Sequence, residues 1–192
     1  GHPMVDVVRD YQKSLALDED LPKNGEAKRI IAILPGSRKQ EIQKKLPVML
    51  EASRQFRNER FVVAKAPGIE DTFYREIMSA YREVDSVQNE TYALLQKAAA
   101  AMVTSGTATL ETGLIGVPQI VCYKGNPISY RIAKKILTIK YISLVNLILD
   151  KQVVKELIQE DFTAENICIE LDHLLNDRGK REMILQAYAQ LR

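Results

Sequence analysis

The stretch Arg29-Ile-Ile-Ala-Ile-Leu-Pro-Gly-Ser-Arg38 decides the fold. Its apolar run is rich in β-branched isoleucine, which favours a buried strand, and the Pro-Gly pair ends that strand in a tight turn. Residues 37–56 then carry apolar side chains at the spacing of a helix, namely Ile42, Leu46, Met49, Leu50 and Phe56. A strand, a tight turn and a helix predict the first part of a β-α-β unit, whose strands are parallel.

The alternation of short apolar runs with helical patterns continues along the chain. Further strands are expected at residues 61–65, 84–88, 99–104, 118–123 and 141–144, with helices between them at 69–81, 91–98, 107–115 and 127–137. Three more helices are expected at residues 152–159, 163–175 and 179–191. This pattern is typical of a parallel sheet that helices cover on both faces. We therefore predict an α/β fold with a Rossmann-like, doubly wound parallel sheet of about six strands.

Composition excludes several classes of protein. Of 192 residues, 46% are hydrophobic and 27% are charged, which is ordinary for a globular domain and rules out a disordered chain or a collagen-like fibre. Lys and Arg number 27 against 25 acidic residues, so the net charge of +2 predicts no nucleic-acid binding. The average hides a basic segment, because residues 112–149 contain no Asp or Glu.

The start of the chain reads as a separate unit. Residues 1–24 are predicted to be an inter-domain helix and a connector, because an apolar helical pattern runs into a polar stretch with Pro22. Residues 25–192 then form the Rossmann-like domain. The chain opens with Gly1-His2-Pro3 and no initiator methionine, which indicates either a cloning remnant or a piece of a longer protein.

Several kinds of catalytic site lack their motifs. The dinucleotide fingerprint, the P-loop and the Gly-x-Ser-x-Gly elbow are all missing from the sequence. The two histidines, His2 and His173, and the two cysteines, Cys122 and Cys168, show no metal-ligand spacing. We therefore predict neither a metal site nor a His-based triad. Cys122, within an apolar run, is expected to be a small buried hydrophobe.

The loop after the first strand is a candidate anion site. In a doubly wound sheet, ligands bind beyond the carboxyl ends of the strands at the point where the strand order reverses. Gly36 lets the backbone approach a ligand, Ser37 is expected to cap the following helix, and Arg38 can bind phosphate through two hydrogen bonds. A plain turn with a capping serine and a solvated arginine is the alternative.

The loop after the fourth strand is a second candidate. Ser105, Gly106 and Thr107 offer hydroxyls and backbone amides at the start of a helix, which suits an anion. Glu111 lies one turn into that helix, where a carboxylate could accept hydrogen bonds from ribose hydroxyls. The alternative is a capping box, in which a Ser or Thr and a following Glu satisfy the helix start.

Two features of the basic segment complete the candidates. Asn146 is a polar residue in an apolar stretch and must be hydrogen-bonded if it is buried; the alternative to a site residue is a side chain that only bonds a neighbouring turn. The predicted helix at residues 127–137 combines apolar positions with Arg131, Lys134 and Lys135, so it could lie on an anionic membrane surface. The alternative is a helix whose apolar side packs on the core and whose basic side faces solvent.

Four motifs in register resemble the lipid-A-disaccharide synthase family. They are Leu34-Pro-Gly-Ser-Arg-Lys-Gln-Glu-Ile, Thr104-Ser-Gly-Thr-Ala-Thr-Leu-Glu, Tyr141-Ile-Ser-Leu-Val-Asn-Leu-Ile and Val153-Val-Lys-Glu-Leu-Ile-Gln-Glu. Gly1-His2-Pro3 also resembles the motif that closes the family's N-terminal domain. The resemblance runs from residue 1 to about residue 175, with Val145 where the family usually has Pro.

The resemblance implies the C-terminal, donor-binding half of a two-domain, GT-B type glycosyltransferase. The implied reaction transfers 2,3-diacylglucosamine, with inversion, from its UDP donor to 2,3-diacylglucosamine 1-phosphate, and it needs no cofactor. The implied donor site contains Gly36, Ser37, Arg38, Ser105, Gly106, Thr107, Glu111 and Asn146. The catalytic base is expected in the other half, so this chain is expected to turn over nothing alone.

The resemblance also implies the surroundings of the enzyme. The expected location is the cytoplasm, peripheral at the inner membrane of a Gram-negative bacterium, and a homodimer is possible. Two alternatives stay open from the sequence. One is another UDP-sugar enzyme of the same architecture, such as a UDP-N-acetylglucosamine 2-epimerase or the muramyl-lipid N-acetylglucosaminyltransferase. The other is a non-catalytic module that binds a nucleotide or a membrane.

Overall fold

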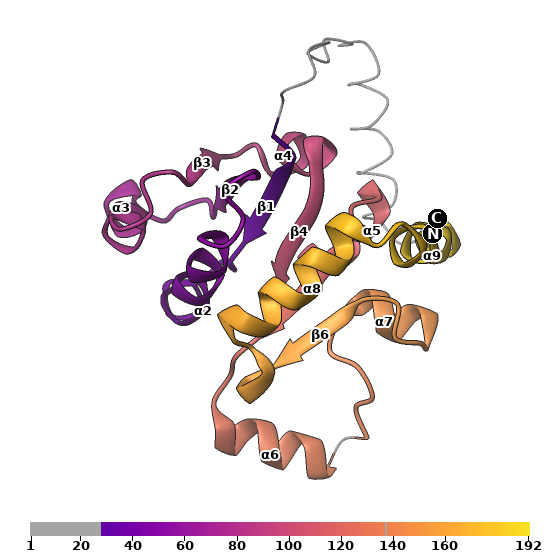
Figure 1. Ribbon diagram of the computed structural model, residues 1–192. Coiled ribbons are helices and arrows are strands. Elements are labelled where there is room, and N and C mark those ends of the chain that lie inside the picture. The colour runs from indigo at the N-terminus through magenta and orange to yellow at the C-terminus, as the bar shows by residue number, and fades with distance from the viewer. Residues whose placement is uncertain (1–27, 137) are drawn as a thin grey trace.

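The computed structural model describes residues 28–136 and 138–192. Its centre is one sheet of six parallel strands in the order β3-β2-β1-β4-β5-β6 (Figure 1). The strands are β1 (Ile30–Leu34), β2 (Arg60–Lys65), β3 (Asp85–Gln88), β4 (Ala98–Thr104), β5 (Gln119–Tyr123) and β6 (Lys155–Ile158). This is the strand order of the doubly wound dinucleotide-binding fold, and it reverses between β1 and β4. The predicted fold class is confirmed.

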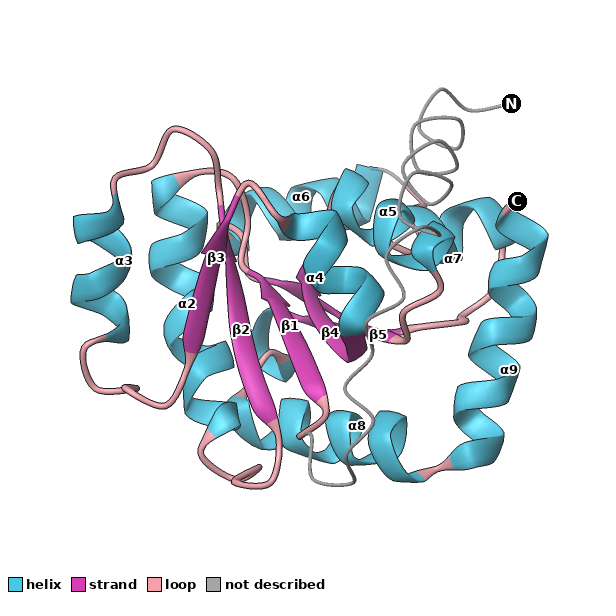
Figure 2. Ribbon diagram, turned by 90° about the horizontal axis from the view of Figure 1, so that it is seen from above, coloured by secondary structure: helices cyan, strands magenta, loops and turns pink. Residues whose placement is uncertain are grey.

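Helices lie on both sides of the sheet (Figure 2). Those before the basic segment are α2 (Lys39–Ser53), α3 (Asp71–Met78), α4 (Thr91–Lys97) and α5 (Thr107–Ile115). Those within or after it are α6 (Pro127–Ile136), α7 (Leu144–Leu149), α8 (Ala164–Asn176) and α9 (Arg178–Tyr188), with single 3-10 turns at Gln159–Asp161 and Ala189–Leu191.

The strand β1 shows why both faces are covered. Ile31 and Ile33 belong to the larger core, which α2 and α8 close from one side, whereas Ala32 and Leu34 belong to a second core that α4 closes from the other. Successive side chains of a strand point to opposite faces, so an uninterrupted apolar run is what a strand buried on both faces requires. Cys122 is fully buried, as expected, and burial raises the pKa of its thiol to about 12.

Two element predictions after residue 140 are wrong. The predicted strand at 141–144 is a turn that leads into α7, and the predicted helix at 152–159 instead contains β6 and the turn Gln159–Asp161. A short apolar run cannot by itself be assigned to a strand or a helix. Pairing with β5, which places Leu157 beside Cys122, decides the assignment. The predicted connector at residues 1–24 lies outside the described residues.

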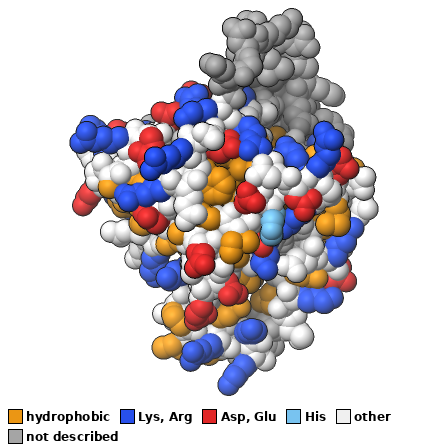
Figure 3. All heavy atoms as spheres, in the orientation of Figure 1, with side chains coloured by type: hydrophobic (Ala, Val, Ile, Leu, Met, Phe, Trp, Pro, Cys, Tyr) orange, Lys and Arg blue, Asp and Glu red, His pale blue; other side chains and the backbone are white. Residues whose placement is uncertain are grey.

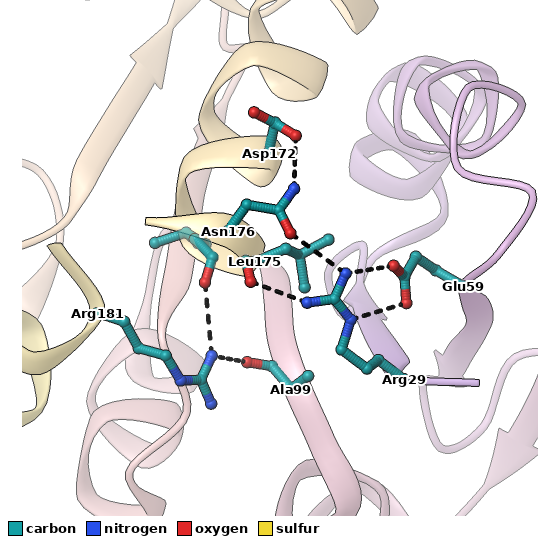
Figure 4. A network of polar contacts seen from close by, with 8 residues as sticks. Arg29, Glu59, Ala99, Asp172, Leu175, Asn176 and Arg181 are labelled. Atoms are coloured by element: carbon teal, nitrogen blue, oxygen red, sulfur yellow. Dashed lines mark hydrogen bonds and ion pairs between the residues drawn. The ribbon is translucent and has the colours of Figure 1, made fainter. Parts of the chain in front are cut away.

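The amino ends of β1 and β4 are tied to the helices by two arginines (Figure 4). Arg29 binds the carboxylate of Glu59 through two nitrogens, at 2.6 and 3.2 Å, and donates to the carbonyl oxygen of Leu175 at 2.8 Å. Arg181 donates to the carbonyl oxygen of Ala99 at 2.7 Å. These contacts satisfy carbonyl groups near the end of α8 and the start of β4. The two arginines therefore stabilise the packing at the amino ends of the strands.

Candidate functional site

A pocket of about 370 Å³ opens at the carboxyl ends of β1, β2 and β4. We call it the switch-point pocket, because the strand order reverses there. The structure brings seven of the eight predicted donor-site residues to this pocket; they are Gly36, Ser37, Arg38, Ser105, Gly106, Thr107 and Glu111. Thr91, Thr104, Lys65 and Glu41 also line it. Two loops that are far apart in sequence thus form one site.

The start of α2 faces this pocket. Arg38, not Ser37, is the N-cap residue, and among the described residues no side chain caps the helix, so the prediction that Ser37 caps it is wrong. The first backbone N–H groups of α2 are therefore open to an anion. Arg38 is exposed, and within residues 28–136 and 138–192 no side chain pairs with its guanidinium. A free guanidinium beside open amides is suited to phosphate.

The start of α5 is built in the same way. Its N-cap is Gly106, with a φ of 132°, and no side chain within the described part of the chain caps the helix. The capping-box alternative is therefore wrong: Thr109 donates its hydroxyl to the Gly106 carbonyl at 2.8 Å, and Glu111 is not used as a cap. Apart from its neighbours in the chain, no atom of residues 28–136 and 138–192 lies within 4 Å of the position that a Gly106 Cβ would occupy. Gly106 is needed for its backbone conformation.

Glu111 is half-buried and faces the pocket beside Tyr92 of α4. Burial, with a smaller effect from the Glu111 carboxylate, raises the pKa of Tyr92 to about 12. Tyr92 therefore stays a neutral hydrogen-bonding partner at physiological pH. The carboxylate of Glu111 thus lies in the pocket lining one turn into α5.

The loop after β1 and the loop after β4 lie close together. Gly36 has a φ of 120°, and a Cβ there would lie 2.9 Å from Glu41 Oε2 and 3.5 Å from Thr104 Cγ2. Behind Thr104 lies Lys45 of α2, which is buried and donates to Thr104 Oγ1 at 2.5 Å. Burial lowers the pKa of Lys45, and the nearby Glu41 carboxylate opposes that shift.

Lys45 and Lys65 are the residues that sequence reasoning missed. Lys65 ends β2, lines the pocket and pairs with Asp71 Oδ1 at 2.5 Å. A lysine at the last position of a predicted strand is a signal that could have identified Lys65. Lys45 lies three residues after Ile42 and directly before Leu46, on the apolar side of the helix, but a lysine is rarely fully buried unless it is paired.

Asn146 does not line the switch-point pocket. It is fully buried in α7, and its side-chain amide donates to Val154 O and to Glu156 Oε1, each at 2.9 Å. Its side-chain oxygen accepts from the backbone N–H groups of Val153 and Val154 at 2.8 and 3.0 Å. The carboxylate of Glu156 also accepts from the Ser143 hydroxyl at 2.8 Å. Asn146 therefore connects α7 to β6 through its side-chain hydrogen bonds. The structure gives no geometric support for its predicted contact with the donor.

Helix α6 carries the predicted membrane-facing residues Arg131, Lys134 and Lys135, and all three are exposed. Ile128 and Ile132 of the same helix are 69% and 52% exposed, so for these two residues the core-packed alternative is wrong. Blue and orange side chains lie together at the lower end of the molecule, where α6 is (Figure 3). Among the described residues, no group of three or more His, Cys, Asp or Glu could hold a metal ion, and none of the helices there could span a membrane.

The fold and the site define a class of protein. A UDP-GlcNAc 2-epimerase from Neisseria meningitidis, solved with UDP-GlcNAc bound, has a TM-score of 0.62 at 14% identity over 97% of this chain and 51% of that one. The glycosyltransferase WaaG, involved in lipopolysaccharide biosynthesis, has a TM-score of 0.55 at 13% identity over 99% of this chain and 46% of that one. The domain therefore has the Rossmann-like fold of GT-B glycosyltransferases and epimerases.

Residues 1–191 match the model of the lipid-A-disaccharide synthetase family, and the chain belongs to that family. The lipid-A-disaccharide synthase of Geobacter sulfurreducens is 33% identical over 95% of this chain and 48% of its own length. That of Syntrophus aciditrophicus is 36% identical over 100% of this chain and 51% of its own length. The chain spans about half the length of the curated relatives that it matches.

Proposed function

We propose that this chain is the donor-binding, C-terminal half of a two-domain glycosyltransferase that makes the lipid A disaccharide. In the proposed reaction, 2,3-diacylglucosamine passes from UDP to 2,3-diacylglucosamine 1-phosphate with inversion, and UDP leaves. Family membership and the names of the relatives support the reaction. The observation that carries the role of this half is the meeting of two uncapped helix starts and the free Arg38 guanidinium at one pocket.

These groups suit a diphosphate leaving group. Negative charge grows on the diphosphate as its bond to the sugar breaks, and fixed N–H groups and a guanidinium stabilise that charge most in the transition state. Arg38 and the starts of α2 and α5 would supply them, and Glu111 would hold the ribose. The base that deprotonates the acceptor is expected in the other half of the enzyme, so the chain alone should bind UDP and leave the donor unconverted.

Calorimetry with UDP tests the proposed donor site. Arg38→Gln and Glu111→Gln should each weaken UDP binding by about 10- to 100-fold, which is the range for a lost charge-assisted hydrogen bond. Arg178→Gln is the matched control, because Arg178 is also an exposed arginine at a helix start but lies on α9. Absence of UDP binding to the folded wild-type chain, or an equal loss in the control, would contradict the proposal.

A second proposed function is contact with an anionic membrane through α6. The exposed Ile128 and Ile132 beside Arg131, Lys134 and Lys135 support it. The double variant Lys134→Glu/Lys135→Glu should lose flotation with anionic vesicles. The control Lys44→Glu/Lys97→Glu makes the same change in net charge at exposed positions of α2 and α4 and should keep it. Equal loss in both double variants would mean that net charge alone drives the binding.

The remaining partners belong to the same proposal. The acceptor is expected to bind mainly to the other half, the enzyme is expected at the cytoplasmic side of the inner membrane of a Gram-negative bacterium, and a homodimer remains a prediction. The two alternatives, another UDP-sugar enzyme and a non-catalytic module, are not favoured, because the family model matches residues 1–191.

A further inference from the structure

A second cavity lies at the same edge of the sheet, beyond the carboxyl ends of β5 and β6. Its volume is about 990 Å³, at the upper end of the range for small-molecule sites. Its lining is mainly aromatic and aliphatic, with Tyr123 from β5, Ile158 from β6, Tyr130 from α6, and Ile142 and Leu147 before and within α7. We call it the apolar cavity.

The apolar cavity adjoins the switch-point pocket. Ser105, in the loop after β4, lines both. This continuity follows from the topology, because parallel strands place the loops after β1, β4, β5 and β6 along one edge of the sheet. One ligand can therefore place a polar part against the starts of α2 and α5 and an apolar part in the apolar cavity.

The lining of the apolar cavity exposes large apolar side chains to water. Leu147 is 46% exposed and Ile139 is 49% exposed, and the rings of Tyr123 and Tyr130 lie 6.1 Å apart between centroids. Covering such side chains with an apolar ligand removes both surfaces from water, which is favourable in proportion to the area covered. The chemistry of the lining thus selects an aliphatic chain over a second sugar.

The charged groups of the lining indicate an anionic ligand. Among the described residues the lining holds two lysines, Lys134 and Lys140, and one carboxylate, Asp150. Lys140 pairs with Asp150 at 3.6 Å, whereas Lys134 Nζ lies 5.9 Å from the centroid of the Tyr130 ring. An aliphatic chain that belongs to an anionic molecule satisfies both the apolar wall and the excess of positive charge.

We propose that the apolar cavity binds an aliphatic chain of the same sugar nucleotide whose diphosphate lies in the switch-point pocket. The inference rests on the proposed function and adds a place on this chain for the acyl part of the donor. The chain enters past Ser105 and lies against Tyr123 and Leu147. Donor affinity therefore depends on acyl length, and α6 covers the site from one side.

The test compares three kinds of ligand on the same chain by calorimetry, with acylated ligands kept below their micelle concentration. The ligands are UDP, UDP-N-acetylglucosamine, and UDP-2,3-diacylglucosamine with acyl chains of four, six and eight carbons. UDP and UDP-N-acetylglucosamine should bind with similar affinity. Affinity should then rise two- to fourfold for each methylene that leaves water.

Two matched pairs of variants locate the chain. Leu147→Ser should reduce the gain per methylene and leave UDP affinity unchanged, whereas Leu185→Ser, on α9 and 37% exposed, should change neither. Ile139→Ser and Ile169→Ser form the second pair, since each isoleucine is 49% exposed and Ile169 lies on α8. Circular dichroism confirms that each variant is folded.

Each outcome has one meaning. A gain with acyl length that only Leu147→Ser and Ile139→Ser reduce supports the proposal. UDP binding with no dependence on acyl length overturns it and leaves the proposed function intact. Failure of UDP to bind overturns the proposed function, and this inference with it. If Leu147→Ser weakens vesicle flotation but not the dependence on acyl length, the face is a membrane contact and the proposal is wrong.

Discussion

Replacing Asn146 by alanine separates a structural role from a donor-binding role. The side chain makes four hydrogen bonds, two as donor to Val154 O and Glu156 Oε1 and two as acceptor from Val153 N and Val154 N. All four hydrogen bonds join α7 to β6 or to the residues just before it, and Asn146 is fully buried. Asn146→Ala leaves all four groups without this partner, and two of them, Val154 N and Val154 O, are in buried hydrogen bonds.

The expected loss is large. At about 1 kcal/mol for each hydrogen bond, with a further penalty for buried groups left unsatisfied, Asn146→Ala should lower the free energy of unfolding by about 3–5 kcal/mol. That is a large part of the 5–15 kcal/mol that is usual for a domain. With a slope of about 2 kcal/mol per molar urea, the midpoint should fall by about 1.5–2.5 M.

Urea unfolding followed by circular dichroism measures this loss. Asn166→Ala is the control, because Asn166 makes one exposed side-chain hydrogen bond, to Asp161 O at 2.9 Å, and should lose about 1 kcal/mol or less. Folded Asn146→Ala should bind UDP as the wild type does. The reasoning is refuted if its stability falls no more than that of Asn166→Ala, or if UDP affinity drops more than tenfold at unchanged stability.

Three further predictions follow from residues of the site. Burial lowers the pKa of Lys45, so the folded state binds fewer protons at this group than the unfolded state between that lowered pKa and 10.5, and the contribution of Lys45 to stability rises with pH there. The urea midpoint of Lys45→Met should therefore fall relative to that of the wild type as the pH is raised from 7 to 9 and 10.5; a difference that does not change with pH would contradict this. Gly36→Ala should cost about 1–3 kcal/mol because φ is 120°, whereas Gly179→Ala, inside α9, should cost nothing or stabilise; equal midpoints would contradict this. Tyr92→Phe should weaken UDP binding several-fold in the wild type but not in Glu111→Gln, and additive effects in this double-mutant cycle would mean that Tyr92 does not position Glu111.

Much of the fold could be predicted because its signals are local. The run from Ile30 to Leu34 is apolar at every position, which only a strand buried on both faces or a buried helix explains, and the following Pro-Gly excludes the helix. Gly36 and Gly106 could be assigned to turns after strands for the same reason, because the signals for these turns lie in neighbouring residues. Parallel topology then brought both turns to one edge of the sheet without any further assumption.

The wrong predictions concern segments whose secondary structure is decided by contacts with residues far away in the sequence. Residues 153–158, with two apolar residues on either side of Lys155 and Glu156, fit a helix or a strand equally well, and only pairing with β5 makes residues 155–158 a strand. Glu156, in that strand, accepts hydrogen bonds from the side chains of Ser143 and Asn146, so the partners of Asn146 also depend on this pairing. A buried polar residue shows in the sequence, but its partner does not.

The sequence by itself determined the class of fold, the two loops that line the switch-point pocket and the family, because each depends on residues that are close together along the chain. Tertiary structure alone decided that Lys45 is buried behind Thr104, that Asn146 ties α7 to β6, and that an apolar cavity adjoins Ser105. Each of these depends on the burial and pairing of groups far apart in sequence. Burial and pairing are properties of the packed molecule, and no local pattern encodes them.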